Sequence, residues 1–146
     1  MTTRLDPVKS PEQWNAYHEL RRVVLFENRG LYGVYNQNHP DERAQNNYPM
    51  LFYSENIAVG VIRIDLNPEQ RSAIFRRLAI RDGQQRRGFG RSLMQHAEAF
   101  AVAHGCTSFV VNAALDAVGF YQKLGYQLDT TSPLNDQKSP RMVKRS

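Results

Sequence analysis

Residues 74–104 read IFRRLAIRDGQQRRGFGRSLMQHAEAFAVAH, and this stretch decides the fold. Its pattern predicts an apolar strand that ends at Ile80, a turn rich in arginine and glycine, and a long amphipathic helix that begins at the glycines. The first N–H groups of a helix have no acceptor inside it, and the aligned peptide dipoles favour negative charge at that end. The stretch therefore predicts an anion-binding site at the start of the helix.

The turn has the residues that a diphosphate site needs. Gly88 and Gly90 lack a Cβ, so a ligand can approach their backbone closely. Three arginines with forked donors suited to phosphate lie in the same turn, and they are Arg86, Arg87 and Arg91. The P-loop pattern G-x-x-x-x-G-K-[ST] is absent, and Leu93 stands where the dinucleotide fingerprint requires its third glycine.

Two motifs resemble one known family. Gln85-x-x-Gly88-x-Gly90 follows a predicted strand that ends Leu78-Ala79-Ile80, and this resembles the acyl-CoA signature Q/R-x-x-G-x-G/A of the GNAT N-acetyltransferase superfamily. Residues 117–126, AVGFYQKLGY, resemble a segment near the end of the same acetyltransferases. One predicted helix and one predicted strand separate the motifs, which is the family's spacing. The resemblance covers roughly residues 50–130.

The resemblance implies acetyl-CoA as the co-substrate and assigns roles to residues. The strand backbone at Leu78 and Ile80 would hold the pantetheine arm, the turn would hold the pyrophosphate, and Tyr121 would lie near the sulfur as general acid. A backbone N–H of the same strand would stabilise the oxyanion. The implied CoA-binding positions are Leu78, Ala79, Ile80, Gln85, Arg86, Arg87, Gly88, Phe89, Gly90, Arg91 and Tyr121. Asn112, at the end of the next predicted strand, is a further candidate that the family pattern does not itself assign.

Tyr121 suits the chemistry of acetyl transfer. Attack of a neutral amine on a thioester gives a tetrahedral intermediate that must expel a thiolate. With ordinary pKa values of ~10 for a phenol and ~8.5 for a thiol, the proton transfer to sulfur is uphill by about 2 kcal/mol. A positioned phenol can therefore supply the proton at modest cost.

Two positions depart from the family pattern. Ile74 stands where many relatives carry a glutamate, and Ala114 stands where many carry an asparagine. The usual general base is therefore missing. Deprotonation through water is one alternative, and the other candidate bases are Glu27, Asp65, His18 and His39.

The predicted function is transfer of an acetyl group from acetyl-CoA to a primary amine of a small molecule or a peptide. The two departures leave open an acyl-CoA-binding protein without turnover. The net charge of +5 and the pI near 9.6 leave open acetylation of an aminoacyl-tRNA. Two basic groups contribute to this charge: Arg76, Arg77, Arg81, Arg86, Arg87 and Arg91 around the turn, and Lys138, Arg141, Lys144 and Arg145 at the end of the chain.

Composition indicates one globular domain over residues 1–146, because 41% of the residues are hydrophobic and 23% are charged. The chain has no apolar run long enough to span a bilayer and no apolar stretch near its start, so we expect a cytoplasmic protein. Cys106 is the only cysteine and is expected to be a buried hydrophobe. No cysteine pair predicts a metal site, and the sequence does not decide between monomer and homodimer.

The predicted fold class is α/β, with a mixed α+β sheet of the kind the resemblance implies. An antiparallel meander is followed by two parallel β-α steps, and helices cover both faces. Residues 29–49 are expected to form a partly ordered loop that lines the substrate site. Strands are expected at 3–9, 50–54, 57–66, 71–80, 107–112, 126–130 and 140–144, and helices at 11–26, 41–46 and 114–124. A further helix is expected to begin at the glycines at 88–90 and to end at His104-Gly105.

Overall fold

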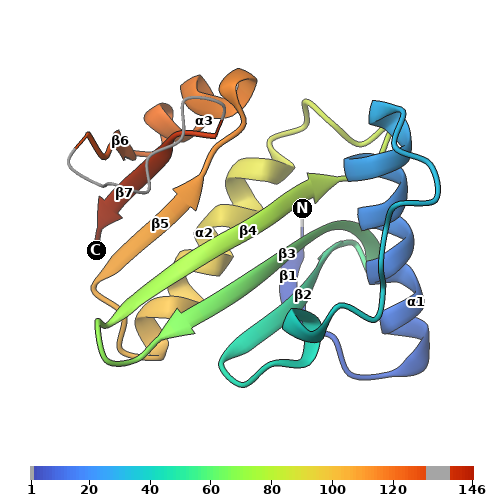
Figure 1. The fold of residues 1–146 in the computed structure, drawn as a ribbon, viewed down its shortest axis with the longest axis horizontal. Helices are drawn as coiled ribbons and strands as arrows, with labels where there is room; N and C mark the ends of the chain where they lie inside the picture. The colour runs from blue at the N-terminus through green and yellow to red at the C-terminus, as the bar shows by residue number, and fades with distance from the viewer. Residues whose placement is uncertain (1, 131–138) are drawn as a thin grey trace.

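The computed structural model describes residues 2–130 and 139–146. Within them, seven strands form one mixed sheet in the order β1-β2-β3-β4-β5-β7-β6 (Figure 1). The strands are β1 Thr3–Pro7, β2 Asn47–Ser54, β3 Ile57–Asn67, β4 Ser72–Ile80, β5 Ser108–Asn112, β6 Gln127–Leu128 and β7 Arg141–Arg145. The helical segments are α1 Pro11–Leu20, η1 Arg21–Phe26, η2 Glu27–Arg29, η3 Pro40–Arg43, α2 Phe89–Ala103, η4 Leu115–Ala117 and α3 Val118–Lys123.

The antiparallel meander is confirmed. Strands β2, β3 and β4 pair in sequence, and β1 pairs with the outer edge of β2. The β2–β3 connection is the two-residue turn Glu55-Asn56, with φ values of 50° and 67°. Positive φ at both central residues matches the twist of the flanking strands, which makes this connection tight.

Only one of the two predicted β-α steps gives a parallel pair. Strand β4 pairs in parallel with β5 across α2, as expected. The second step was predicted wrongly, because β7 lies between β5 and β6 and is antiparallel to both. Strand β7 forms five residue pairs with β5, whereas β6 is only two residues long. The longer strand β7 therefore lies next to β5, and β6 lies at the edge of the sheet.

The basic end of the chain is part of this sheet. In β7, Arg141 lies 3.4 Å from the carboxylate of Asp129, and Lys144 donates to Glu98 at 2.9 Å. These cations are therefore at least partly compensated inside the fold. Lys138 lies outside the described residues.

Helices cover both faces of the sheet, as predicted (Figure 1). On β2, Met50 and Phe52 pack into the core beneath α2 and α3, while Leu51 packs into the core beneath α1. This alternation has the period of two that a strand buried on both faces requires. Cys106 is 5% exposed, which confirms that it is a buried hydrophobe.

Several helix bounds differ from the predictions. Ser10 and Gln13 form the expected capping box of α1, but after Leu20 the helix widens, so that the Glu27 N–H bonds the Arg22 carbonyl five residues back. Gly30, at φ 78°, ends this helical run. The helix expected at 41–46 is the short η3, the one expected at 114–124 divides into η4 and α3, and the strand expected at 126–130 has two residues.

We expect Gly60→Ala to destabilise the fold by about 1–3 kcal/mol, because there is no space for a methyl group. A Cβ at Gly60 would lie 2.9 Å from Ile80 Cδ1, 3.0 Å from the Ala79 carbonyl oxygen and 3.1 Å from Leu93 Cδ1. Gly119 in α3 is the matched control, since a Cβ there meets nothing within 4 Å and alanine favours the helix by about 0.5–1 kcal/mol. Urea unfolding measures both changes, and equal midpoints for the two variants would contradict the packing argument.

Candidate functional site

Strand β4 separates from β5 halfway along its length. The parallel ladder ends where Phe75 pairs with Val111, and residues 76–80 have no strand partner on that edge among the described residues. A bulge places one extra residue of β4 opposite β3, and Arg77 adopts φ 58° within it. Bulges bend a strand and increase its twist. The two strands therefore open into a wedge whose β4 side presents backbone groups without ladder partners.

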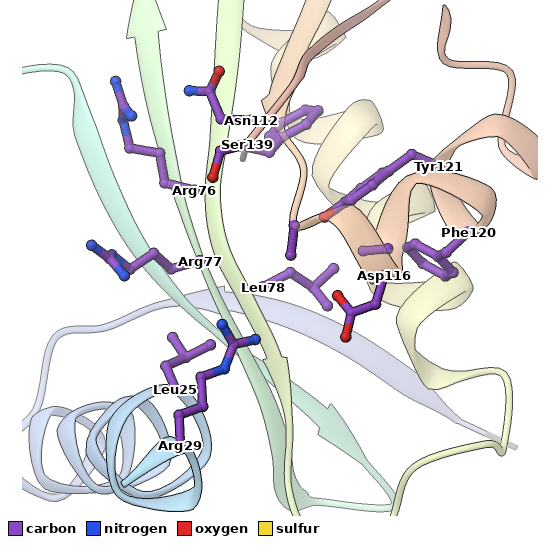
Figure 2. A pocket seen from close by; sticks show the side chains of 13 residues that line it. Leu25, Arg29, Arg76, Arg77, Leu78, Asn112, Asp116, Phe120, Tyr121 and Ser139 are labelled. Carbon is purple, nitrogen blue, oxygen red and sulfur yellow. The ribbon is translucent and has the colours of Figure 1, made fainter. Parts of the chain in front are cut away.

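A cavity of about 380 Å³ lies at this wedge (Figure 2). It brings together three residues that were predicted from the sequence to belong to the site, Leu78, Asn112 and Tyr121. The full lining is Leu25, Arg29, Phe75, Arg76, Arg77, Leu78, Asn112, Ala114, Asp116, Ala117, Phe120, Tyr121 and Ser139. The cavity thus lies where four parts of the fold meet. These are the end of the helical run that α1 begins, the bulge of β4, the end of β5 and the start of α3.

Tyr121 is held rigidly with its hydroxyl toward the cavity (Figure 2). Its ring is 9% exposed and makes edge-to-face contacts with Phe120, at 5.0 Å between centroids, and with Tyr126, at 5.6 Å. Among the described residues, no side chain hydrogen bonds to the hydroxyl. An incoming group can therefore take this donor without breaking a bond.

Burial raises the pKa of Tyr121 to about 12. The phenol is consequently protonated throughout the physiological range. Transfer of its proton to a thiolate of ordinary pKa is uphill by about 5 kcal/mol, more than an unperturbed phenol would require. The free-energy cost of proton transfer that the sequence predicted was too low, because it assumed the pKa of an exposed tyrosine.

The glycine-rich turn is fastened to the end of β4. Gln85 donates its side-chain N–H to the Ile80 carbonyl at 3.2 Å. Gly88, at φ 77°, precedes α2, and within the described part of the chain no side chain caps this terminus. The first intrahelical bond runs from the Ser92 N–H to the Gly88 carbonyl at 3.1 Å. The N–H groups between these two residues are available to an anion.

The glycines of the turn serve different purposes. Gly88 adopts a left-handed conformation with open space around it, so its backbone is accessible. At Gly90, a Cβ would lie 3.2 Å and 3.3 Å from two ring atoms of Phe120. Gly90 therefore lets α2 pack closely against the helix that carries Tyr121.

The arginines predicted around the turn divide into two groups. Arg86, Arg87 and Arg91 are exposed at the turn and the start of α2. Two others, Arg76 and Arg77, instead line the cavity at the far end of the open β4 edge, and Arg81 pairs with Glu19 at 3.5 Å. The prediction that all six surround the turn was wrong, because β4 carries residues 76 and 77 away from it.

None of the residues predicted as an alternative base lines this cavity. Glu27 pairs with Arg22 at 3.3 Å. Asp65 accepts hydrogen bonds from Arg63 and Arg76. His18 and His39 line a second cavity of about 270 Å³ beside Trp14, on the α1 side of the sheet.

Asp116 is the carboxylate that lines the Tyr121 cavity, and the sequence analysis missed it. It lies two residues after Ala114, in the η4 segment that leads into α3. Its position directly before the second motif was the feature of the sequence that could have indicated a place in the site.

The loop at residues 29–49 was expected to line the substrate site. Only Arg29, at its start, reaches the cavity beside Tyr121. Tyr35 packs edge-to-face on Phe26, at 5.2 Å between centroids, and Glu42 is buried at 4% exposure, so parts of the loop are anchored to α1. Residues 37–40, 42 and 43 contribute to the second cavity instead.

The described residues hold no group of three or more His, Cys, Asp or Glu side chains arranged to bind a metal ion. In the same part of the chain, no helix is both long and apolar enough to cross a membrane.

The site combines an open strand edge with a glycine-rich helix start and a buried phenol between them. This combination is typical of the class of acyl-CoA-dependent N-acyltransferases. The family model "Acetyltransferase (GNAT) family" matches residues 14–126, and the chain belongs to this family. It is accordingly an acetyl-CoA-dependent N-acetyltransferase.

Similar proteins extend over nearly the whole chain. The uncharacterized protein YyaT of Bacillus subtilis is 27% identical over 118 residues, which cover 81% of this chain and 78% of that protein. Escherichia coli ElaA has the same fold, with a TM-score of 0.81 and 17% identity over 99% of this chain and all of that one. The PaiA N-acetyltransferase of Thermoplasma acidophilum, solved with coenzyme A, has a TM-score of 0.74 and 16% identity, with both chains fully covered.

Proposed function

We propose that this chain acts as a single domain that transfers the acetyl group of acetyl-CoA to a primary amine of a small molecule or a peptide, with Tyr121 as general acid. The observation that carries the proposal is the position of the Tyr121 hydroxyl. It is the buried donor that faces the cavity between the open edge of β4 and the end of β5.

The residues fit acetyl-CoA as the acetyl donor. The open edge of β4 at Leu78–Ile80 offers backbone groups to the amides of a pantetheine arm laid alongside it as an additional strand. The N–H groups from Arg86 through Arg91 receive the pyrophosphate, and the three arginines there add charge. Gln85 keeps the turn closed against Ile80.

The reaction proceeds by direct attack. The neutral amine nitrogen bonds to the thioester carbon, and a backbone N–H at Leu78–Ile80 stabilises the oxyanion. The C–S bond then breaks, Tyr121 gives its proton to the departing sulfur, and water returns a proton to the phenolate. The proton of the new ammonium leaves through water, or through Asp116, the one carboxylate among the described lining residues.

Titration calorimetry with acetyl-CoA and a thiol-release assay with an amine panel test this function together. We expect saturable micromolar binding and amine-dependent thiol release. The double variant Arg86→Gln/Arg87→Gln should weaken acetyl-CoA binding about a hundredfold, because two charge-assisted contacts to phosphate are lost and each contributes about tenfold. Arg4→Gln is the matched control and should leave binding unchanged, because the Arg4 guanidinium lies over the ring of Tyr53, on the face of the sheet opposite α2.

Each failure has its own meaning. Tight binding without thiol release across the panel would point to an acyl-CoA-binding protein instead. Absence of acetyl-CoA binding would contradict the proposal altogether, and tRNA binding at low salt would then be measured.

A further inference from the structure

The cavity beside Tyr121 carries an excess of positive charge. Among the described residues that line it, three are arginines and one, Asp116, is a carboxylate. Arg29 and Arg77 have no ion-pair partner in the described part of the chain, and the Arg77 guanidinium lies 5.6 Å from the ring of Phe26. Arg76 pairs with Asp65 at 2.7 Å, but Arg63 occupies the same carboxylate.

These arginines are placed apart from the phosphate-binding turn. They lie at the bulge of β4 and at the end of η2, whereas the turn begins after Ile80 at the other end of the open edge. Each residue of an extended strand advances about 3.3 Å, so at least 10 Å of β4 separates Arg77 from the turn. The phosphates of CoA are served by Arg86, Arg87 and Arg91, which leaves the cavity arginines for another anion.

The arginines occupy the side from which an acceptor would approach. Figure 2 shows Arg76 and Arg77 extending from β4 on the side away from Tyr121, while Arg29 rises from η2 with its guanidinium toward Leu78. Tyr121 marks the leaving sulfur in the proposed mechanism. The attacking nitrogen then enters from the opposite side, past these guanidinium groups.

A simple alkylammonium ion would be repelled by this lining. The same positive potential favours the neutral form of an amine once it is inside, which is useful in a site where Ile74 replaces the usual basic glutamate. Binding must therefore come from another part of the acceptor. Forked guanidinium donors suit a carboxylate in geometry and charge.

We infer that the acceptor is an amine that also carries a carboxylate, and that Arg29 and Arg77 bind this carboxylate. The inference rests on the proposed function, since it names the acceptor class of that reaction. Arg76 contributes to the field but remains held by Asp65.

Equilibrium binding separates this inference from turnover. The chain saturated with CoA is titrated by calorimetry with glycine, L-phenylalanine and γ-aminobutyrate, and with the primary amide of each. We expect at least one of the acids to bind about tenfold more tightly than its amide, as one charge-assisted contact requires. The variant Arg29→Gln/Arg77→Gln should remove this preference while leaving the affinity for CoA unchanged, and Arg4→Gln should alter neither.

The possible outcomes distinguish the carboxylate site from the proposed acetyl transfer. Equal affinity for acids and amides, no binding of any acid, or an equal loss of both in the double variant would overturn the inference. In a parallel thiol-release assay, turnover of amides without preference would leave the proposed function standing and refute the carboxylate site. Arginine-dependent binding of an acid without turnover of any amine would support the site and refute the proposed function.

Discussion

Tyr121→Phe is expected to lower kcat about a hundredfold and to leave the affinity for acetyl-CoA within about twofold. The substitution removes one oxygen and retains the ring that packs against Phe120 and Tyr126. General acid catalysis contributes between about a hundredfold and ten-thousandfold, most when the pKa of the acid lies near the working pH. Burial raises the pKa of Tyr121 to about 12, so the loss should lie at the lower end of that range.

The pH profile provides a second readout of the same role. Because Tyr121 keeps its proton well above neutral pH, kcat should rise with pH as the acceptor amine loses its own proton. No decline assigned to Tyr121 is expected below about pH 10, where an exposed tyrosine would begin to ionise. A decline near neutral pH that disappears in Tyr121→Phe would mean that the phenol titrates there and that its buried setting has been misread.

Tyr126→Phe is the matched control for the catalytic role. Its hydroxyl donates to Glu98 at 2.8 Å and does not line the cavity. The variant should lose about 1.5–3 kcal/mol of stability, because the lost hydrogen bond has a charged acceptor, with kcat changed less than about threefold. The assignment of the acid fails if Tyr121→Phe and Tyr126→Phe have the same kcat under conditions where chemistry limits the rate.

Local patterns in the sequence account for much of the architecture. The meander, the helix that begins after Gly88 and the parallel β4–β5 step follow from periodicity, turn residues and caps within short windows. The position of β7 does not, because its pairing with β5 joins residues about thirty or more apart in sequence, and the preference for β7 over β6 depends on tertiary contacts. The bulge at Arg77 is also invisible locally, since arginine gives no signal for a left-handed conformation.

The residues of the candidate site also fall into those that local sequence patterns predict and those that depend on tertiary packing. The two motifs predicted Leu78 and Tyr121, and Asn112 was a further candidate at the end of a predicted strand. The fold brings these three residues to one cavity. Arg29 and Asp116 reach it from segments that carry no motif of their own. Their presence depends on where the helical run after α1 ends and on how η4 enters α3, both of which are set by packing.

Glu42→Gln is expected to destabilise the fold by about 3–5 kcal/mol, the largest effect of any single substitution considered for stability. The Glu42 carboxylate is 4% exposed and accepts hydrogen bonds from Tyr17 at 2.8 Å, from Arg21 and from Arg63 at 3.4 Å. An amide is isosteric but uncharged, so the buried guanidinium of Arg21 would lose its counterion, whereas Arg63 would keep Asp65. Arg21 is poorly placed to compensate, because its Nε is already buried and has no acceptor among the residues that the structure describes.

Glu19→Gln is the control for this prediction. Glu19 also faces an arginine, Arg81, at 3.5 Å, but its side chain is 54% exposed, and exposed pairs contribute between zero and about 1 kcal/mol. Urea unfolding should therefore separate the two glutamate variants by several kcal/mol at an unchanged denaturant slope. Similar midpoints would mean that water reaches Glu42. The structural reason to expect otherwise is that Glu42 joins the loop to α1 through Arg21 and to the sheet through Arg63, so its charge stabilises three segments at once.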